Sequence, residues 1–144
     1  MSLVFRHAIV VGASSGMGAE IARQLAADGC AVALLGRRTE ELQKVAATIV
    51  AGGRGTTLVK QHDVTQYDTV PALLGELVQE LGGLDLLVYA AGIQYSPGEG
   101  EYDFGLCAEY ERPAKAVIDY LETRSDVDVS RIGIWGVSLG GYFA

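Results

Sequence analysis

Short apolar runs alternate along the chain with longer segments in which apolar residues recur every three or four positions. The short runs predict buried strands, and the longer segments predict helices with one face turned toward a core. The expected strands are 7–11, 31–35, 56–60, 84–89 and 131–137, and the expected helices are 19–27, 39–50, 68–81 and 109–122. A loop rich in Gly and Pro is expected at 93–104.

Turn and capping residues set the expected ends of the helices. Thr39 is expected to cap the second helix, and the pairs Asp28-Gly29 and Gly52-Gly53 are expected to end the first two helices. Pro71 would fall in the first turn of the third helix, where a missing N–H costs no hydrogen bond. The nearly continuous apolar strands predict a sheet buried on both faces, so we expect an α/β fold with a parallel sheet.

Composition narrows the class of protein. The 144 residues suffice for one core, and 49% hydrophobic with 20% charged residues is a globular composition. A net charge of -7 disfavours binding to nucleic acid or to an anionic membrane surface. The chain shows neither an apolar run of about 18 residues nor a signal-peptide layout, so we expect a cytoplasmic protein. Cys30 and Cys107 are expected to be reduced thiols, and no metal site is expected.

A glycine-rich loop joins the first expected strand to the first expected helix. Gly12 would permit a sharp turn, Gly16 a close approach to a pyrophosphate, and Gly18 tight packing of helix on strand. The N–H groups that begin the helix would bind the phosphates. The candidate loop residues are Gly12, Ser14, Ser15, Gly16, Met17 and Gly18. The alternative is a glycine-rich turn that binds nothing.

The spacing of this loop, with three residues between its first two glycines, resembles the short-chain dehydrogenase/reductase family. The resemblance covers about residues 5–104 and continues through Leu35-Gly36-Arg37-Arg38, His62-Asp63-Val64 and Tyr89-Ala90-Ala91-Gly92, each after an expected strand. In the last of these, Tyr89 stands in the place of an Asn of the family. The resemblance implies that a dinucleotide binds and that its adenosine is bordered by Asp63, Val64, Ala91 and Gly92.

The end of the second strand bears on the choice of cofactor. NAD-selective sites place a carboxylate there for the ribose 2′-hydroxyl. Here Gly36 supplies no carboxylate, while Arg37 and Arg38 supply positive charge for a 2′-phosphate, so NADP is the expected cofactor and NAD is disfavoured. The alternative is that both arginines are simply solvated at the start of a helix.

The catalytic pair of the family is missing from these 144 residues. The family uses a Tyr and a Lys four positions later to transfer a proton. Tyr110 is followed four positions later by Ala114, and Lys115 stands one position too far. Hydride transfer by the family's mechanism is therefore not expected.

In the last forty residues, Gly136-x-Ser138-x-Gly140 follows an expected strand, an arrangement that resembles the nucleophile elbow of a different family, the α/β-hydrolases. The resemblance implies Ser138 as candidate nucleophile and the N–H of Leu139 as an oxyanion donor. No acid or His follows it, and both histidines precede it; His62 would lie roughly 19 Å away across four strand spacings. Without a base Ser138 would be a weak nucleophile. The alternative is that Ser138 only caps a helix.

The two resemblances suggest a chimera, most simply an engineered one, joined near Phe104–Leu106. The expected product is a single Rossmann-like domain over 1–144, dehydrogenase-like in 1–104 and hydrolase-like in 105–144, with a doubly wound parallel five-stranded sheet of order 3-2-1-4-5. The alternative is a natural protein with accidental similarity. An uncovered fifth strand at the sheet edge would favour a homodimer or a domain-swapped oligomer.

Several functions therefore compete. The first is a module that binds NADP(H) without efficient turnover, or the truncated form of an NADP-dependent oxidoreductase. The second is a serine esterase or a scaffold for a reactive Ser138. The third is a non-catalytic chain in which two families share one core.

Overall fold

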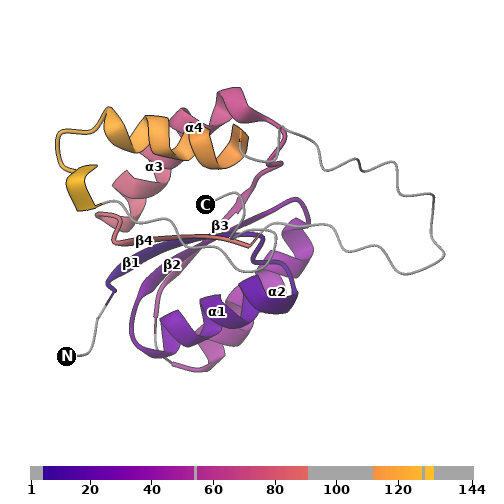
Figure 1. Cartoon of the computed structure of the whole chain (residues 1–144). Coiled ribbons are helices and arrows are strands. Elements are labelled where there is room, and N and C mark those ends of the chain that lie inside the picture. Colours follow the sequence, from indigo (N-terminus) through magenta and orange to yellow (C-terminus); the bar gives the residue numbers. More distant parts are fainter. Residues whose placement is uncertain (1–4, 54, 91–111, 128, 132–144) are drawn as a thin grey trace, which may run out of the picture. The chain divides into compact units, whose positions relative to one another are not determined.

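The computed structural model describes residues 5–53, 55–90, 112–127 and 129–131 (Figure 1). Four strands are present in this part of the chain: β1 (His7–Val11), β2 (Ala31–Gly36), β3 (Thr57–Gln61) and β4 (Leu86–Tyr89). The helices are α1 (Gly16–Ala27), α2 (Thr39–Ala51), α3 (Val70–Leu81) and α4 (Arg112–Glu122), with short 3-10 helices η1 (Tyr67–Thr69) and η2 (Val129–Arg131).

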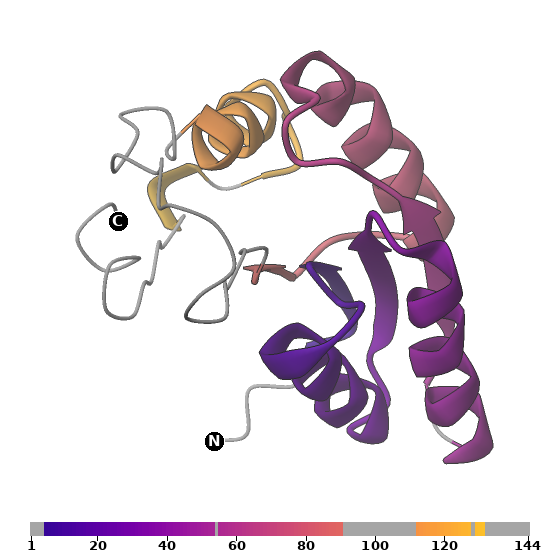
Figure 2. The ribbon, with the colours of Figure 1, turned by 90° about the vertical axis from the view of Figure 1, so that its right-hand side faces the viewer.

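The described strands form one parallel sheet in the order β3-β2-β1-β4, which confirms the expected α/β class and the order of these four strands. Helices α1 and α2 cover one face of the sheet, and α3 covers the other (Figures 1 and 2). Arg131, the first residue of the expected fifth strand, lies in η2 instead. Residues 132–137 lie outside the described residues, so the five-stranded sheet stays a prediction.

The central strands β1 and β2 are buried on both faces because their side chains alternate between two apolar layers, whereas β3 and β4 at the edges of the described sheet are half-buried. Toward α1 and α2, Val10 and Leu34 join a core that also contains Leu42 of α2. Their neighbours Ile9 and Leu35 point to the opposite face and are equally buried. The buried residues of α3 within this unit are Leu74, Leu77, Val78 and Leu81. The apolar runs in the sequence thus gave strands of the expected kind.

β1 has the predicted bounds, and the boundaries of the other elements differ from the prediction by up to three residues. α1 begins at Gly16 rather than Ala19, so the glycine loop itself forms its first turn. Thr39 is the first residue of α2 and Arg38 is its N-cap, so the expectation that Thr39 caps this helix is wrong. β4 begins at Leu86, and the carboxylate of Asp85 just before it accepts the N–H groups of Arg6 and of His7, the first residue of β1.

The chain divides into two compact units, 1–66 with 72–94, and 67–71 with 95–144. The first contains the sheet and most of its helices. Within this first unit, Lys60 of β3 forms ion pairs with two glutamates of α3: its Nζ lies 2.6 Å from Glu76 Oε1 and 3.0 Å from Glu80 Oε1. No helix in the described ranges is long and apolar enough to cross a membrane.

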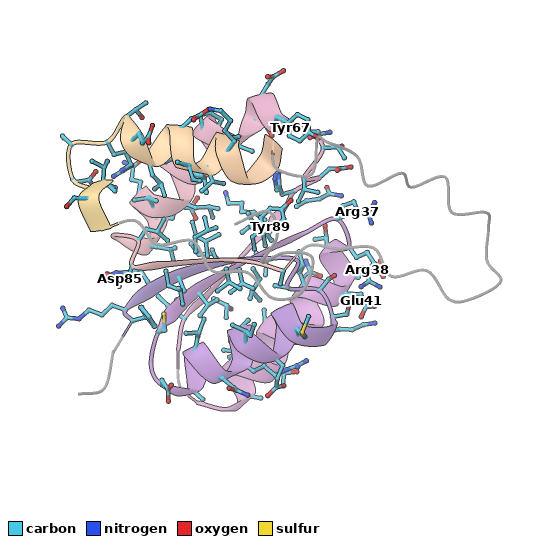
Figure 3. The ribbon with its side chains drawn as sticks, in the orientation of Figure 1. Arg37, Arg38, Glu41, Tyr67, Asp85 and Tyr89 are labelled. Atoms are coloured by element: carbon cyan, nitrogen blue, oxygen red, sulfur yellow. The ribbon has the colours of Figure 1, made fainter. Side chains whose placement is uncertain are left out.

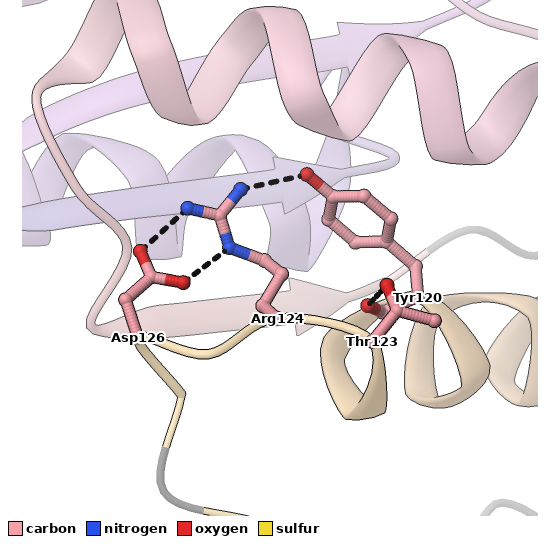
Figure 4. A network of polar contacts seen from close by, with 4 residues as sticks. All are labelled: Tyr120, Thr123, Arg124 and Asp126. Carbon is pink, nitrogen blue, oxygen red and sulfur yellow. Dashed lines mark hydrogen bonds and ion pairs between the residues drawn. The ribbon is translucent and has the colours of Figure 1, made fainter.

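In the second unit, a polar network closes the end of α4 (Figure 4). Arg124 donates from Nε and Nη2 to the two carboxylate oxygens of Asp126, at 2.8 and 2.6 Å, and from Nη1 to the hydroxyl of Tyr120 at 2.8 Å. Thr123 Oγ1 donates to the carbonyl of Tyr120 at 2.7 Å. The bidentate ion pair between Arg124 and Asp126 fixes the turn after the helix, because two charge-assisted hydrogen bonds define the orientation of both side chains.

Candidate functional site

The carboxyl ends of the four strands meet at one edge of the sheet. The register pairs Val11 with Leu35 of β2 and with Tyr89 of β4, and pairs Gly36 with Gln61 of β3. The loops that leave this edge carry the residues predicted from the sequence to bind a cofactor. Ligands of open parallel sheets bind in the crevice outside such carboxyl ends.

The glycine loop leaves β1 by a turn that only small residues accept. Gly12 has a φ of 86° and Gly16 a φ of 57°, values in the left-handed region that strains other residues. The N–H groups of Gly12 and Ala13 both donate to the carbonyl of Leu35, at 2.8 and 3.0 Å. These bonds fasten the loop to the end of β2 and direct the chain into α1.

Gly18 allows α1 to approach the loop closely, as the sequence predicted. A Cβ atom at this position would lie 2.9 Å from the carbonyl carbon of Gly12 and 3.3 Å from the Cβ of Ala90 after β4. The first of these distances is shorter than real Cβ contacts and the second is tight, so the helix could keep its place only with glycine here. Among the described residues, no atom lies within 4 Å of a Cβ placed on Gly16, so these residues leave this side of the loop open to a ligand's approach.

Arg38 reaches back from the start of α2 to the glycine loop. Its Nη2 donates to Ser14 Oγ at 3.1 Å and to Ser15 Oγ at 2.7 Å. Figure 3 shows Arg37 and Arg38 at the end of the sheet opposite Asp85. Both arginines are exposed, and no carboxylate among the described residues lies within ion-pair distance of either guanidinium. Asp63 and Glu41 interact with Arg37 and Arg38 through longer-range charge attraction only, so both guanidinium groups keep N–H donors for an anion.

The loop after β3 carries the expected neighbours of an adenosine. Asp63 accepts the N–H of Thr65 at 3.0 Å and its hydroxyl at 2.8 Å. These bonds from Thr65, with smaller contributions from Arg37 and His62, lower the pKa of Asp63. The side chain is thus an ionised carboxylate at neutral pH that shapes its own loop. Val64 follows it and is half-buried.

His62 is buried at the end of β3, where its N–H donates to the carbonyl of Gly36 at 3.0 Å. Burial lowers the pKa of its imidazole, and the nearby Asp63 opposes this only in part. The ring is therefore neutral at pH 7. His7 begins β1 at the other end of the sheet, where its Nδ1 lies 3.4 Å from Asp85 Oδ2.

Some of the remaining predicted site residues lie within the described ranges, and others lie outside them. Met17, in the first turn of α1, is 80% exposed. Ala90 donates its N–H to the carbonyl of Val11, which places the chain after β4 beside the glycine loop. Ala91, Gly92 and Ser138 lie outside the described residues, so their roles stay predictions.

Two features of the site escaped the sequence analysis. Arg38 was expected at a phosphate, and its contact with Ser14 and Ser15 was not predicted. Gln61 was not predicted either; its side-chain amide donates to the carbonyl of Arg37 at 3.1 Å. Neither contact follows a sequence period, because each depends on two strand ends lying side by side. Within the described ranges, no group of three His, Cys, Asp or Glu side chains could hold a metal ion.

Comparison with known proteins finds relatives among the dehydrogenases, in agreement with the glycine loop and the parallel sheet described above. A sequence profile described as short chain dehydrogenase matches residues 6–110. An uncharacterised oxidoreductase of Mycobacterium tuberculosis is 38% identical over 86 residues, covering 59% of this chain and 34% of the relative. The match to the profile passes the expected boundary at residue 104, and these comparisons give no support to a hydrolase segment or an engineered chimera.

Two solved structures extend the similarity to three dimensions. A short-chain type dehydrogenase/reductase from Mycobacterium marinum has a TM-score of 0.67 at 32% identity, covering 83% of this chain and 51% of that one. Actinorhodin polyketide ketoreductase, solved with NADPH, has a TM-score of 0.65 at 27% identity, covering 81% and 47%. The chain thus spans about a third of the length of the curated relative and about half of the solved chains.

Proposed function

Because this chain belongs to the short chain dehydrogenase family, we propose that its glycine loop binds a nicotinamide dinucleotide and prefers NADP(H) to NAD(H). The observation that carries the proposal is the placement of Arg38 on the loop hydroxyls, beside the uncapped start of α1. The family binds NAD(P) cofactors, and this chain's own residues argue for the phosphorylated form.

The start of α1 fits a pyrophosphate. Its first N–H groups have no partner within the helix, and the side chain of the N-cap residue Ser15 does not cap them. The partial positive charge of a helix N-terminus favours an anion at this place. The positive φ of Gly16 and the open space beside it let phosphate oxygens approach the backbone. Gly12, Gly16 and Gly18 would therefore hold the pyrophosphate.

The end of β2 fits a 2′-phosphate better than a free ribose hydroxyl. Gly36 offers no carboxylate to accept a hydrogen bond from a hydroxyl, and the two following residues are arginines. A guanidinium binds phosphate oxygens through paired N–H donors. Arg37 and Arg38 would bind the 2′-phosphate, while Asp63 and Val64, with Ala91 and Gly92, would border the adenine.

Bound NADPH supplies a hydride in the reactions of such reductases. In this chain the part that holds the cofactor is present, whereas the 144 residues contain no Tyr-x-x-x-Lys pair to move the proton. We propose that the chain as given binds the cofactor without efficient turnover. Truncation of a longer oxidoreductase would give the same behaviour.

A titration followed by NADPH fluorescence tests the cofactor preference. We expect NADPH to bind more tightly than NADH, and we expect Arg37→Gln to weaken NADPH binding about tenfold while changing NADH binding little. Arg6→Gln removes the same charge at the opposite end of the sheet and should leave both affinities unchanged. Equal affinities for NADPH and NADH in the unchanged protein would refute the preference.

The serine hydrolase function remains a second candidate, because the motif Gly136-x-Ser138-x-Gly140 lies beyond the residues that match the dehydrogenase family. A fluorophosphonate probe should label Ser138 if the elbow activates it, and Ser138→Ala should abolish the labelling. Labelling no stronger than that of the Ala variant would exclude this function. The same outcome would leave cofactor binding untouched.

We also propose self-association through the expected fifth strand, as a homodimer or a domain-swapped oligomer. An open strand edge offers unpaired N–H and C=O groups to a second copy. Light scattering at high protein concentration distinguishes the states, and a monomer there would refute the proposal.

A further inference from the structure

Ser15 occupies the N-cap of α1 but does not act as a cap. Its backbone is extended, with φ -166° and ψ 175°, which is the usual conformation of this position. A serine here normally accepts a hydrogen bond from an N–H two or three residues further along. No such side-chain bond is present, so the first N–H groups of the helix keep their capacity for another acceptor.

The hydroxyl of Ser15 is bonded to Arg38 instead. Arg38 Nη2 donates to it at 2.7 Å and to the hydroxyl of Ser14 at 3.1 Å. Arg38 is itself the N-cap of α2, and its carbonyl accepts the N–H of Leu42 at 3.1 Å. One side chain therefore connects the starts of the two helices that follow β1 and β2.

The direction of these bonds matters for an anion. A hydroxyl that accepts a bond from a guanidinium still has its own proton to donate. The positive charge of the donor also polarises the hydroxyl, which strengthens its next bond to an acceptor. Ser15 can therefore accept from Arg38 and donate to a phosphate oxygen at the same time.

We propose that Ser15 is a positioning residue for the preference for NADP(H): it holds the Arg38 guanidinium at the glycine loop and leaves the α1 amides free for the pyrophosphate. This inference rests on the proposed function of the same site. It assigns to Ser15 an effect that depends on the 2′-phosphate, because the guanidinium that it orients is the one expected to bind that group. A serine needed only for folding would affect both cofactors alike.

The test compares the affinities for NADPH and NADH in the full chain, by fluorescence titration, for Ser15→Ala, Ser15→Thr and the unchanged protein. Loss of one hydrogen bond to a charged group predicts that Ser15→Ala weakens NADPH binding about 5- to 10-fold and NADH binding less than about twofold. Ser15→Thr keeps a hydroxyl and should restore the preference. Thr48→Ala, which removes an exposed hydroxyl bonded to a carbonyl of α2, is the matched control and should change neither affinity.

Two outcomes would overturn the inference: no effect of Ser15→Ala on NADPH binding, or an equal loss for both cofactors. If the unchanged protein binds neither dinucleotide at millimolar concentration, the proposed function itself fails. In that case, a double-mutant cycle of Ser15→Ala and Arg38→Gln, measured by thermal unfolding, determines whether Ser15 and Arg38 interact. Additive effects of the two changes on the unfolding temperature would show that Ser15 does not hold Arg38.

Discussion

A Cβ atom on Gly18 would lie 2.9 Å from the carbonyl carbon of Gly12, so the first turn of α1 and the residue after β1 meet without room for a methyl group. This close approach places the start of α1 directly beside the carboxyl end of the sheet. It is also where the N–H groups of the helix must point if they are to bind phosphate. The packing of the fold and the geometry of the site thus depend on the same glycine.

Gly18→Ala should therefore lower both stability and cofactor affinity. The added methyl group must displace backbone rather than a flexible side chain, and such overpacking costs about 2–3 kcal/mol of unfolding free energy. Gly29→Ala, at the other end of α1, introduces strain from its φ of 92° but meets no atom within 4 Å. We expect this control to cost only about 1 kcal/mol and to keep NADPH binding. Denaturant unfolding of both variants measures the difference, and equal costs would contradict the steric explanation.

Asp85 makes the stability of the fold depend on pH. Its Oδ2 accepts the N–H groups of Arg6 and His7, at 2.8 and 2.9 Å, and lies 3.4 Å from His7 Nδ1. Burial alone would raise the pKa of Asp85, but these donors and the imidazole outweigh it and lower the pKa. A carboxylate with a lowered pKa in the fold stabilises it above the ordinary value of about 4, and this contribution disappears as the pH falls through the folded value.

The expected result is that Asp85→Asn destabilises the protein by roughly 1 kcal/mol at pH 7, a modest figure because the carboxylate is partly exposed to solvent. The loss should shrink as the pH is lowered below about 4, where Asp85 of the unchanged protein becomes protonated. Urea unfolding at pH 7 and at pH 3 measures it. Asp28→Asn, an exposed carboxylate at the end of α1, serves as the control. A cost that does not change with pH would show that the charge of Asp85 contributes nothing.

The reactivity of the Cys30 thiol reports whether the core between the sheet and α1 opens to solvent. Its side chain is 1% exposed, and burial raises the pKa of the thiol. Both effects suppress the thiolate that reacts with alkylating agents. In a Cys107→Ala background, we expect iodoacetamide to modify Cys30 only when denaturant unfolds the protein. Rapid modification under native conditions, followed by mass spectrometry, would mean that this core opens without global unfolding.

Much of the fold could be predicted because it follows local patterns. The alternation of apolar runs and amphipathic segments located the four described strands and their helices, and Gly18 was correctly expected at a close contact. The ends of helices were less predictable, since they depend on caps. Thr39 is a good capping residue by type, yet Arg38 takes that position, and its side chain bonds to Ser14 of the glycine loop instead of capping the helix.

The site was predictable only as a set of residues at strand ends. Their mutual contacts depend on the order of the strands, which brings β1 beside β2 although 19 residues separate Val11 from Ala31. The bond from Arg38 to Ser15 spans 23 positions and leaves no periodic trace in the sequence. The sequence alone therefore assigned Arg38 a ligand but not its protein partners.

The affinities for NADPH and NADH should depend differently on ionic strength. NADPH carries a 2′-phosphate that NADH lacks, and its expected partners, Arg37 and Arg38, are exposed guanidinium groups. Attraction between exposed charges is screened over about 10 Å at 0.1 M salt and over about 3 Å at 1 M. Raising the KCl concentration from about 20 mM to about 500 mM should weaken NADPH binding several-fold more than NADH binding. In Arg37→Gln this extra salt dependence should diminish. An identical salt dependence for the two cofactors in the unchanged protein would mean that the arginines do not bind the 2′-phosphate.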